Sequence, residues 1–111
     1  PTVTISTEAQ TITTDSLSIS GTAYDETALS YVKCRIGSAP DASNGTTMTG
    51  TTSWSGTLTG FSEGANTVYC KAKDTSDNWS DSDTVAITYT PGSTGCSGVV
   101  MTGTSSIVIT P

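Results

Sequence analysis

Short runs of alternating apolar and polar residues cover most of the first 90 positions of this chain. Val3 and Ile5 alternate with threonines, and Leu17 and Ile19 alternate with serines. Comparable runs occupy residues 31–37, 52–58, 66–74 and 83–90. Alternation with a period of two is typical of a strand with one side on a core and the other in water. Because the runs are separated by stretches rich in Gly, Asp, Asn and Ser, they predict an antiparallel β-sandwich or barrel without helices.

Composition narrows the functions that such a fold could have. The 111 residues are enough for one domain with a modest core. The formal net charge of −6 disfavours binding to nucleic acid or to anionic membranes, and no apolar run approaches the roughly 20 residues of a membrane-spanning helix. Histidine is absent, so the commonest general base is missing and we do not expect an enzyme. A chain that begins at Pro1 and not at methionine is expected to be processed or part of a longer protein.

Several motifs resemble those of the bacterial Ig-like modules found along large secreted and surface proteins. They are SGTAYD at residues 20–25, WSGTL at 54–58, EGANTVYCKAKD at 63–74, Asn78, and the final alternating run before Pro91. The resemblance covers residues 1–91 and implies an Ig-like antiparallel β-sandwich of about seven strands, with a role in spacing, adhesion or carbohydrate association. The pattern usually lacks cysteines and has glycine before the asparagine, where this chain has Asp77 and then adds Trp79.

All four basic residues fall in two of the predicted strands. If Val32, Cys34 and Ile36 face the core in one strand, and Val68, Cys70 and Ala72 in the other, the residues between them face outward. In the Ig order these two strands are neighbours, so their outer sides form one basic face: Tyr31, Lys33, Arg35, Tyr69, Lys71 and Lys73. Such a face can cover the sheet and discourage edge pairing, or it can dock an acidic polymer or an acidic patch of a neighbouring subunit.

The cysteines allow two interpretations. Cys34 and Cys70 both face inward on strands that the Ig order makes adjacent, so a disulfide could bridge them directly. Alternatively, both are buried free thiols that act as small apolar residues. Three cysteines in a small chain favour the disulfide and an extracellular or cell-surface location, which leaves Cys96 available for an intermolecular disulfide.

Acidic residues gather in two loops that an Ig sandwich places at the same end. Oxygen-rich loops of this kind can bind Ca²⁺, which accepts six to eight oxygen ligands in irregular geometry. The alternative is that these side chains cap tight turns through backbone N–H groups, and no EF-hand pattern is present. The potential ligands are Asp25, Glu26, Asp74, Asp77 and Asn78. Beside them, Trp79 either remains accessible for a sugar ring or a protein contact, or folds back over the end of the loop.

The last 20 residues differ from the rest. A glycine-rich spacer follows Pro91, and residues 97–110 then contain two apolar triplets on either side of a Thr-Gly-Thr break. We expect residues 92–111 to form a spacer and a β-strand tail that packs on this domain, on the next domain of a longer chain, or on an identical subunit. The sequence therefore predicts a non-catalytic extracellular structural or adhesive module, which a strand-donating tail would make a filament subunit. The alternative is a carbohydrate-binding module or a spacer of a larger secreted enzyme.

Overall fold

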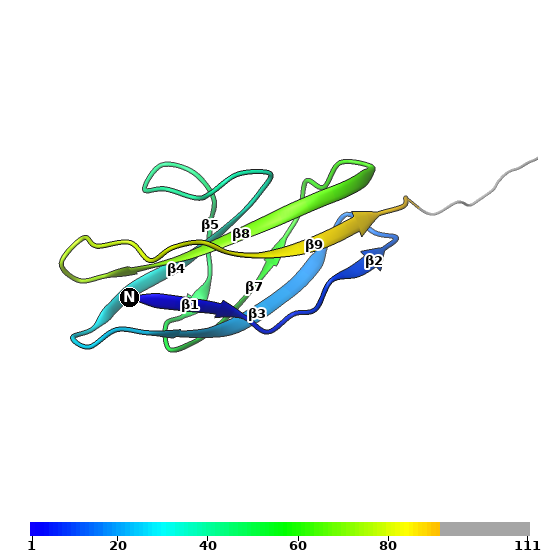
Figure 1. The fold of residues 1–111 in the computed structure, drawn as a ribbon. Coiled ribbons are helices and arrows are strands. Elements are labelled where there is room, and N and C mark those ends of the chain that lie inside the picture. The colour runs from blue at the N-terminus through cyan, green and yellow to red at the C-terminus, as the bar shows by residue number, and fades with distance from the viewer. Residues whose placement is uncertain (92–111) are drawn as a thin grey trace, which may run out of the picture.

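The computed structural model describes residues 1–91, which fold into two β-sheets packed face to face (Figure 1). The described part of the chain contains strands and no helix. The all-β, Ig-like sandwich predicted from the sequence is therefore confirmed. The strands are β1 (Thr2–Ile5), β2 (Gln10–Ile12), β3 (Leu17–Tyr24), β4 (Leu29–Ile36), β5 (Thr46–Thr47), β6 (Thr49–Gly50), β7 (Ser53–Leu58), β8 (Gly64–Asp74) and β9 (Asp83–Tyr89).

The N-terminal segment contributes a strand to each sheet. One sheet has the order β1-β3-β7-β6 and the other has the order β2-β9-β8-β4-β5. Strand β2 runs parallel to β9, whereas the other described pairs are antiparallel, a mixture that was not predicted from the sequence. The Asp83 carboxylate accepts a hydrogen bond from the Ile5 backbone N–H at 2.7 Å. This bond from β9 to the end of β1 helps to hold the segment where it leaves the first sheet.

The three shortest strands were not predicted from the sequence either. Strands β2, β5 and β6 have only three, two and two residues, which is too short for alternation to be recognised. Between β5 and β6, Met48 is buried and donates its backbone N–H to the Val32 carbonyl at 2.8 Å. This short segment therefore passes from one sheet to the other and closes one side of the core.

Trp54 is the largest fully buried side chain of the core. Its indole N–H donates to the Thr22 carbonyl at 3.0 Å, so its polar atom is satisfied inside the sandwich. The ring packs on Gly21, where an added Cβ would lie 2.5 Å from the indole and 2.1 Å from the Thr4 carbonyl oxygen. Glycine is therefore needed at this position of β3 because the indole and the neighbouring strand occupy the space of any side chain.

A disulfide joins Cys34 of β4 to Cys70 of β8. The two residues are direct partners in the strand pairing, and both are fully buried. The bond links two neighbouring strands of one sheet and closes a loop with a sequence separation of 36 residues. Cys96 and the predicted tail strand lie outside the described residues, so those predictions stay predictions.

Candidate functional site

The pairing of β4 with β8 assembles the basic face that the sequence predicted. Tyr31 lies opposite Lys73, Lys33 opposite Lys71, and Arg35 opposite Tyr69. All six side chains are partly exposed, while the residues between them along each strand are mostly buried. All basic residues of the chain therefore share one surface, which we call the basic face.

Like charges oppose each other at the centre of this face. Lys33 and Lys71 are direct cross-strand partners, an arrangement that destabilises an antiparallel pair. The chain has ten acidic residues, yet none stands at an outward position of β4 or β8. A sheet surface that only needed to be covered would gain stability from an acidic or hydroxyl partner at either position. The opposed lysines thus lower the stability of the β4–β8 pair, and a role in covering the sheet does not explain them.

Trp79 joins this face from the loop between β8 and β9. It forms an isolated antiparallel bridge with Lys73, and its ring lies 5.7 Å from the Tyr31 ring in an edge-to-face arrangement. The Lys73 Nζ atom is 5.6 Å from the centre of the Tyr31 ring and 5.5 Å from that of Trp79. The Lys71 Nζ atom is 5.8 Å from Trp79, and the Lys33 Nζ atom is 5.8 Å from Tyr31. We call these five residues the aromatic–lysine cluster.

The cluster changes the interpretation of Trp79. Each of its two aromatic rings has two ammonium groups within cation–π distance, and the rings also contact each other. Trp79 is half-buried and folds back on the sheet, so it is not a freely projecting indole. The rings hold the lysine heads in place more than they offer a bare platform for stacking a neutral sugar.

Two of the lysines have further partners in nearby loops. Lys73 forms an ion pair with Asp77 at 2.9 Å, and this hydrogen bond is the main cause that raises the pKa of Lys73. Lys33 donates to the backbone carbonyls of Asp41 and Ala42 at 3.0 and 3.1 Å. Within residues 1–91, no ion pair involves Lys71 or Arg35. Those two cations are therefore the ones most available to an external anion.

The loop containing Asp41 was not singled out from the sequence. Its carboxylate accepts the backbone N–H groups of Ser43 and Asn44 at 2.8 Å each, which closes the turn whose carbonyls receive Lys33. The Ser43 bond is the leading cause that lowers the pKa of Asp41. Asp41 and the Asn44-Gly45 pair are turn signals, so the sequence predicts a turn-rich connection here, but it does not predict the contact with Lys33.

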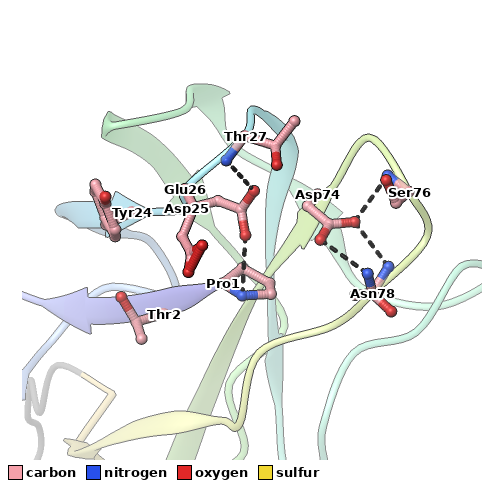
Figure 2. A pocket seen from close by; sticks show the side chains of 9 residues that line it. All are labelled: Pro1, Thr2, Tyr24, Asp25, Glu26, Thr27, Asp74, Ser76 and Asn78. Atoms are coloured by element: carbon pink, nitrogen blue, oxygen red, sulfur yellow. Dashed lines mark hydrogen bonds and ion pairs between the residues drawn. The ribbon is translucent and has the colours of Figure 1, made fainter.

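Four of the five candidate calcium ligands line one open cleft of about 350 Å³ at the end of the sandwich (Figure 2). Asp25 and Glu26 come from the β3–β4 connection, Asp74 ends β8, and Asn78 lies in the β8–β9 connection. The Thr75 N–H donates to the Ala28 carbonyl at 3.1 Å, which joins the two connections. These loops therefore meet at one end of the sandwich, as the Ig order predicted.

Two carboxylates in this cleft, those of Asp25 and Asp74, accept local hydrogen bonds. Asp25 accepts the N–H groups of Thr27 and Ala28 at 3.0 and 3.1 Å, and it lies 3.2 Å from the Pro1 amine (Figure 2). The bond from Thr27 is the leading cause of the lowered pKa of Asp25. Each of these contacts stabilises the ionised carboxylate without a metal ion.

Asp74 is capped in the same way. It accepts backbone N–H groups from Ser76 and Asn78 at 2.8 and 2.9 Å, and the Asn78 side chain at 3.1 Å. The backbone bond from Asn78 is the leading cause that lowers the pKa of Asp74. Asp77 lies apart, in its ion pair with Lys73. Across residues 1–91 no group of three or more His, Cys, Asp or Glu residues is placed to hold a metal, so the structure favours turn capping over a calcium site.

A comparison with known proteins finds a similar fold but assigns no activity. No protein-family model and no curated protein matches the sequence. Among solved structures, the fold is similar to the fibronectin(III)-like modules of CbhA from Clostridium thermocellum, with a TM-score of 0.58 and 19% sequence identity. The match covers 80% of this chain and 97% of that chain. The fold of this chain is thus an Ig-like β-sandwich similar to that of those modules, in agreement with the fold that its sequence motifs implied. In the described residues, no helix is long and apolar enough to cross a membrane.

Proposed function

We propose that this chain is a non-catalytic spacer module of an extracellular bacterial protein. The observation that carries the proposal is the path of the chain. It enters at the start of β1 and leaves after β9 at the opposite end of an elongated sandwich (Figure 1). Modules with ends placed in this way can be joined end to end, so that each adds its own length to the parent protein.

Two further observations support this proposal. The fold is similar to the fibronectin(III)-like modules that form part of Clostridium thermocellum CbhA. In addition, the buried Cys34–Cys70 disulfide supports an oxidising compartment, which is typical of secreted proteins. Adhesion was expected from the family resemblance and filament assembly from residues 92–111, and both stay predictions from the sequence.

A tandem protein made of two copies of the full chain tests the proposal. If the module is a spacer, small-angle X-ray scattering should give a maximum dimension about twice that of one copy, because elongated modules joined end to end add their lengths. Sedimentation velocity of the single copy should show a folded monomer. A compact tandem with the two copies side by side would contradict the spacer function. If the single copy forms filaments, the chain is an assembly subunit and the spacer function is wrong.

A further inference from the structure

We propose that the basic face binds an acidic polysaccharide, a polymer of sugars that carry carboxylates. The first observation is the distribution of charge. The chain has four basic and ten acidic residues, and all four basic ones lie on the basic face of β4 and β8. The acidic residues occupy loops and strand ends, as in the cleft of Asp25 and Asp74. The face is thus complementary to an anion, while the rest of the module repels one.

The second observation is that the face keeps an arrangement that lowers stability. Lys33 and Lys71 oppose each other, and an anion placed between them would turn this repulsion into two attractive contacts. Opposed residues are about 5 Å apart, and residues two apart along a strand are separated by about 7 Å. Lys73 is already paired with Asp77, and the other three cations form a compact group that a single carboxylate would not neutralise. A chain with repeated carboxylates matches this group better than a small anion.

The third observation selects a polysaccharide over an acidic peptide. Tyr31, Tyr69 and Trp79 lie among the cations on the same face, and Tyr31 and Trp79 contact the lysine heads. Tyr69, opposite Arg35, gives apolar contact next to a cation, which suits the C–H surface of a sugar ring that also carries a carboxylate. Because the rings hold Lys71 and Lys73 before any ligand arrives, less conformational entropy is lost on binding.

The position of the face fits a partner that approaches from the side. Strands β4 and β8 form the flank of the sandwich, whereas β1 begins and β9 ends at its two ends (Figure 1). Covalent neighbours in a tandem would therefore meet the ends and leave the basic face uncovered. This inference goes beyond the spacer function, and a module that fails the test below would still be a spacer.

The charge distribution also predicts an unusual dependence on salt. At about 10 mM salt the Debye length is about 30 Å, so a polyanion interacts with the whole molecule and its net charge of −6. At about 100 mM the Debye length is about 10 Å, and the polymer interacts mainly with the basic face. Affinity should therefore rise and then fall as salt increases. A module with an overall positive charge would show only the fall.

The test measures binding of the full chain to polygalacturonate, with dextran as the neutral polymer and poly-L-glutamate as the acidic peptide. The variant Lys71→Gln/Lys73→Gln removes two cations of the face. The matched control Ser18→Glu/Ser53→Glu changes the net charge equally, from −6 to −8, at outward positions of the other sheet. We expect the lysine variant to bind polygalacturonate about tenfold more weakly, because charge-assisted hydrogen bonds are lost. The control should change affinity less than twofold.

Each outcome decides the proposal. The expected ranking of ligands is polygalacturonate first, poly-L-glutamate weaker, and dextran without binding. Equal affinity for poly-L-glutamate would show recognition of charge alone and overturn the polysaccharide as occupant. The inference is also wrong if polygalacturonate does not bind, or if the serine control loses as much affinity as the lysine variant. Should the lysine variant fold poorly, amide chemical shifts of the unmodified protein give a second readout, with changes expected in β4 and β8 and none in β3 and β7.

Discussion

The outward residues of the paired strands β4 and β8 differ from those of β1, β3 and β7 in the other sheet, although both sets follow the same alternation. Along residues 31–35 of β4 and 69–73 of β8, the outward side chains are long and either basic or aromatic. On β1, β3 and β7 they are serine and threonine, apart from the exposed Tyr24 at the end of β3. This second surface, the hydroxyl face, consists of Thr4, Ser18, Ser20, Thr22, Ser53, Ser55 and Thr57, all of them exposed. Alternation requires only that polar side chains face water, and both faces satisfy this requirement. The difference between them is therefore not required by the fold.

The interior supports of the two sheets differ as well. Beneath the basic face, the Cys34–Cys70 disulfide links two neighbouring strands covalently. Beneath the hydroxyl face, Trp54 packs on Gly21 and donates its indole N–H to Thr22. One sheet thus depends on a covalent bond and the other on close packing. Substitutions can test each dependence separately, and the four below run from the largest expected effect to the smallest.

Removing the disulfide should have the largest effect. The double variant Cys34→Ala/Cys70→Ala should lower the free energy of unfolding by about 3–4 kcal/mol, because a closed loop of this length restricts the unfolded chain. Denaturant unfolding monitored by tryptophan fluorescence measures this loss. Both cysteines are fully buried, so the native protein should also resist dithiothreitol until it opens. A loss below about 1 kcal/mol would mean that packing alone supports this sheet.

A methyl group at Gly21 tests the packed sheet. The variant Gly21→Ala should destabilise the protein by about 2 kcal/mol, because the new Cβ would collide with the Thr4 carbonyl and the Trp54 ring. Ser20→Ala is the matched control on the outward side of the same strand and should leave thermal stability nearly unchanged. If both variants melt alike, the contact between Trp54 and β3 is looser than the structure indicates.

A comparison of two variants isolates backbone strain beside the basic face. Asp77 has a positive φ of 68°, a conformation that glycine adopts more readily than other residues. Asp77→Gly and Asp77→Ala both remove the ion pair to Lys73, but only glycine relieves the strain. We expect the glycine variant to be more stable than the alanine variant by about 1 kcal/mol in thermal unfolding. If the glycine and alanine variants are equally stable, the positive φ at Asp77 does not strain the backbone, and Asp77 affects stability through its side chain alone.

The smallest effect concerns the opposed lysines. A double-mutant cycle of Lys33→Gln and Lys71→Gln should give an unfavourable coupling of about 0.5 kcal/mol between the two side chains. The coupling should shrink in about 0.5 M salt because both ammonium groups are partly exposed. The same cycle with Ser20→Ala and Ser55→Ala, opposed on the hydroxyl face, should show no repulsion. A favourable lysine coupling would remove one of the three observations on which the polysaccharide proposal rests.

The sequence was sufficient to predict features that depend on alternation. Alternation placed Cys34 and Cys70 inward and the four basic residues outward, and the Ig-like motifs supplied the neighbouring strands. Loop contacts follow no such period. The bridge of Trp79 to Lys73 and the ion pair of Asp77 depend on how the β8–β9 connection folds back. For the same reason, the sequence left open whether the acidic residues at this end of the sandwich bind Ca²⁺ or cap turns. In the structure, Asp25 and Asp74 cap separate backbone groups.

The parallel pairing of β2 with β9 has a mechanical consequence. If the start of β1 and the end of β9 are pulled apart, β2 and β9 are drawn past each other in opposite directions. Their hydrogen bonds, together with the bond from Thr90 N–H to the Ile12 carbonyl, then carry the force simultaneously instead of opening one at a time. After these β2–β9 hydrogen bonds break, the disulfide still prevents the segment between Cys34 and Cys70 from extending. With a separation of 36 residues, it shortens the fully stretched module by about 120 Å.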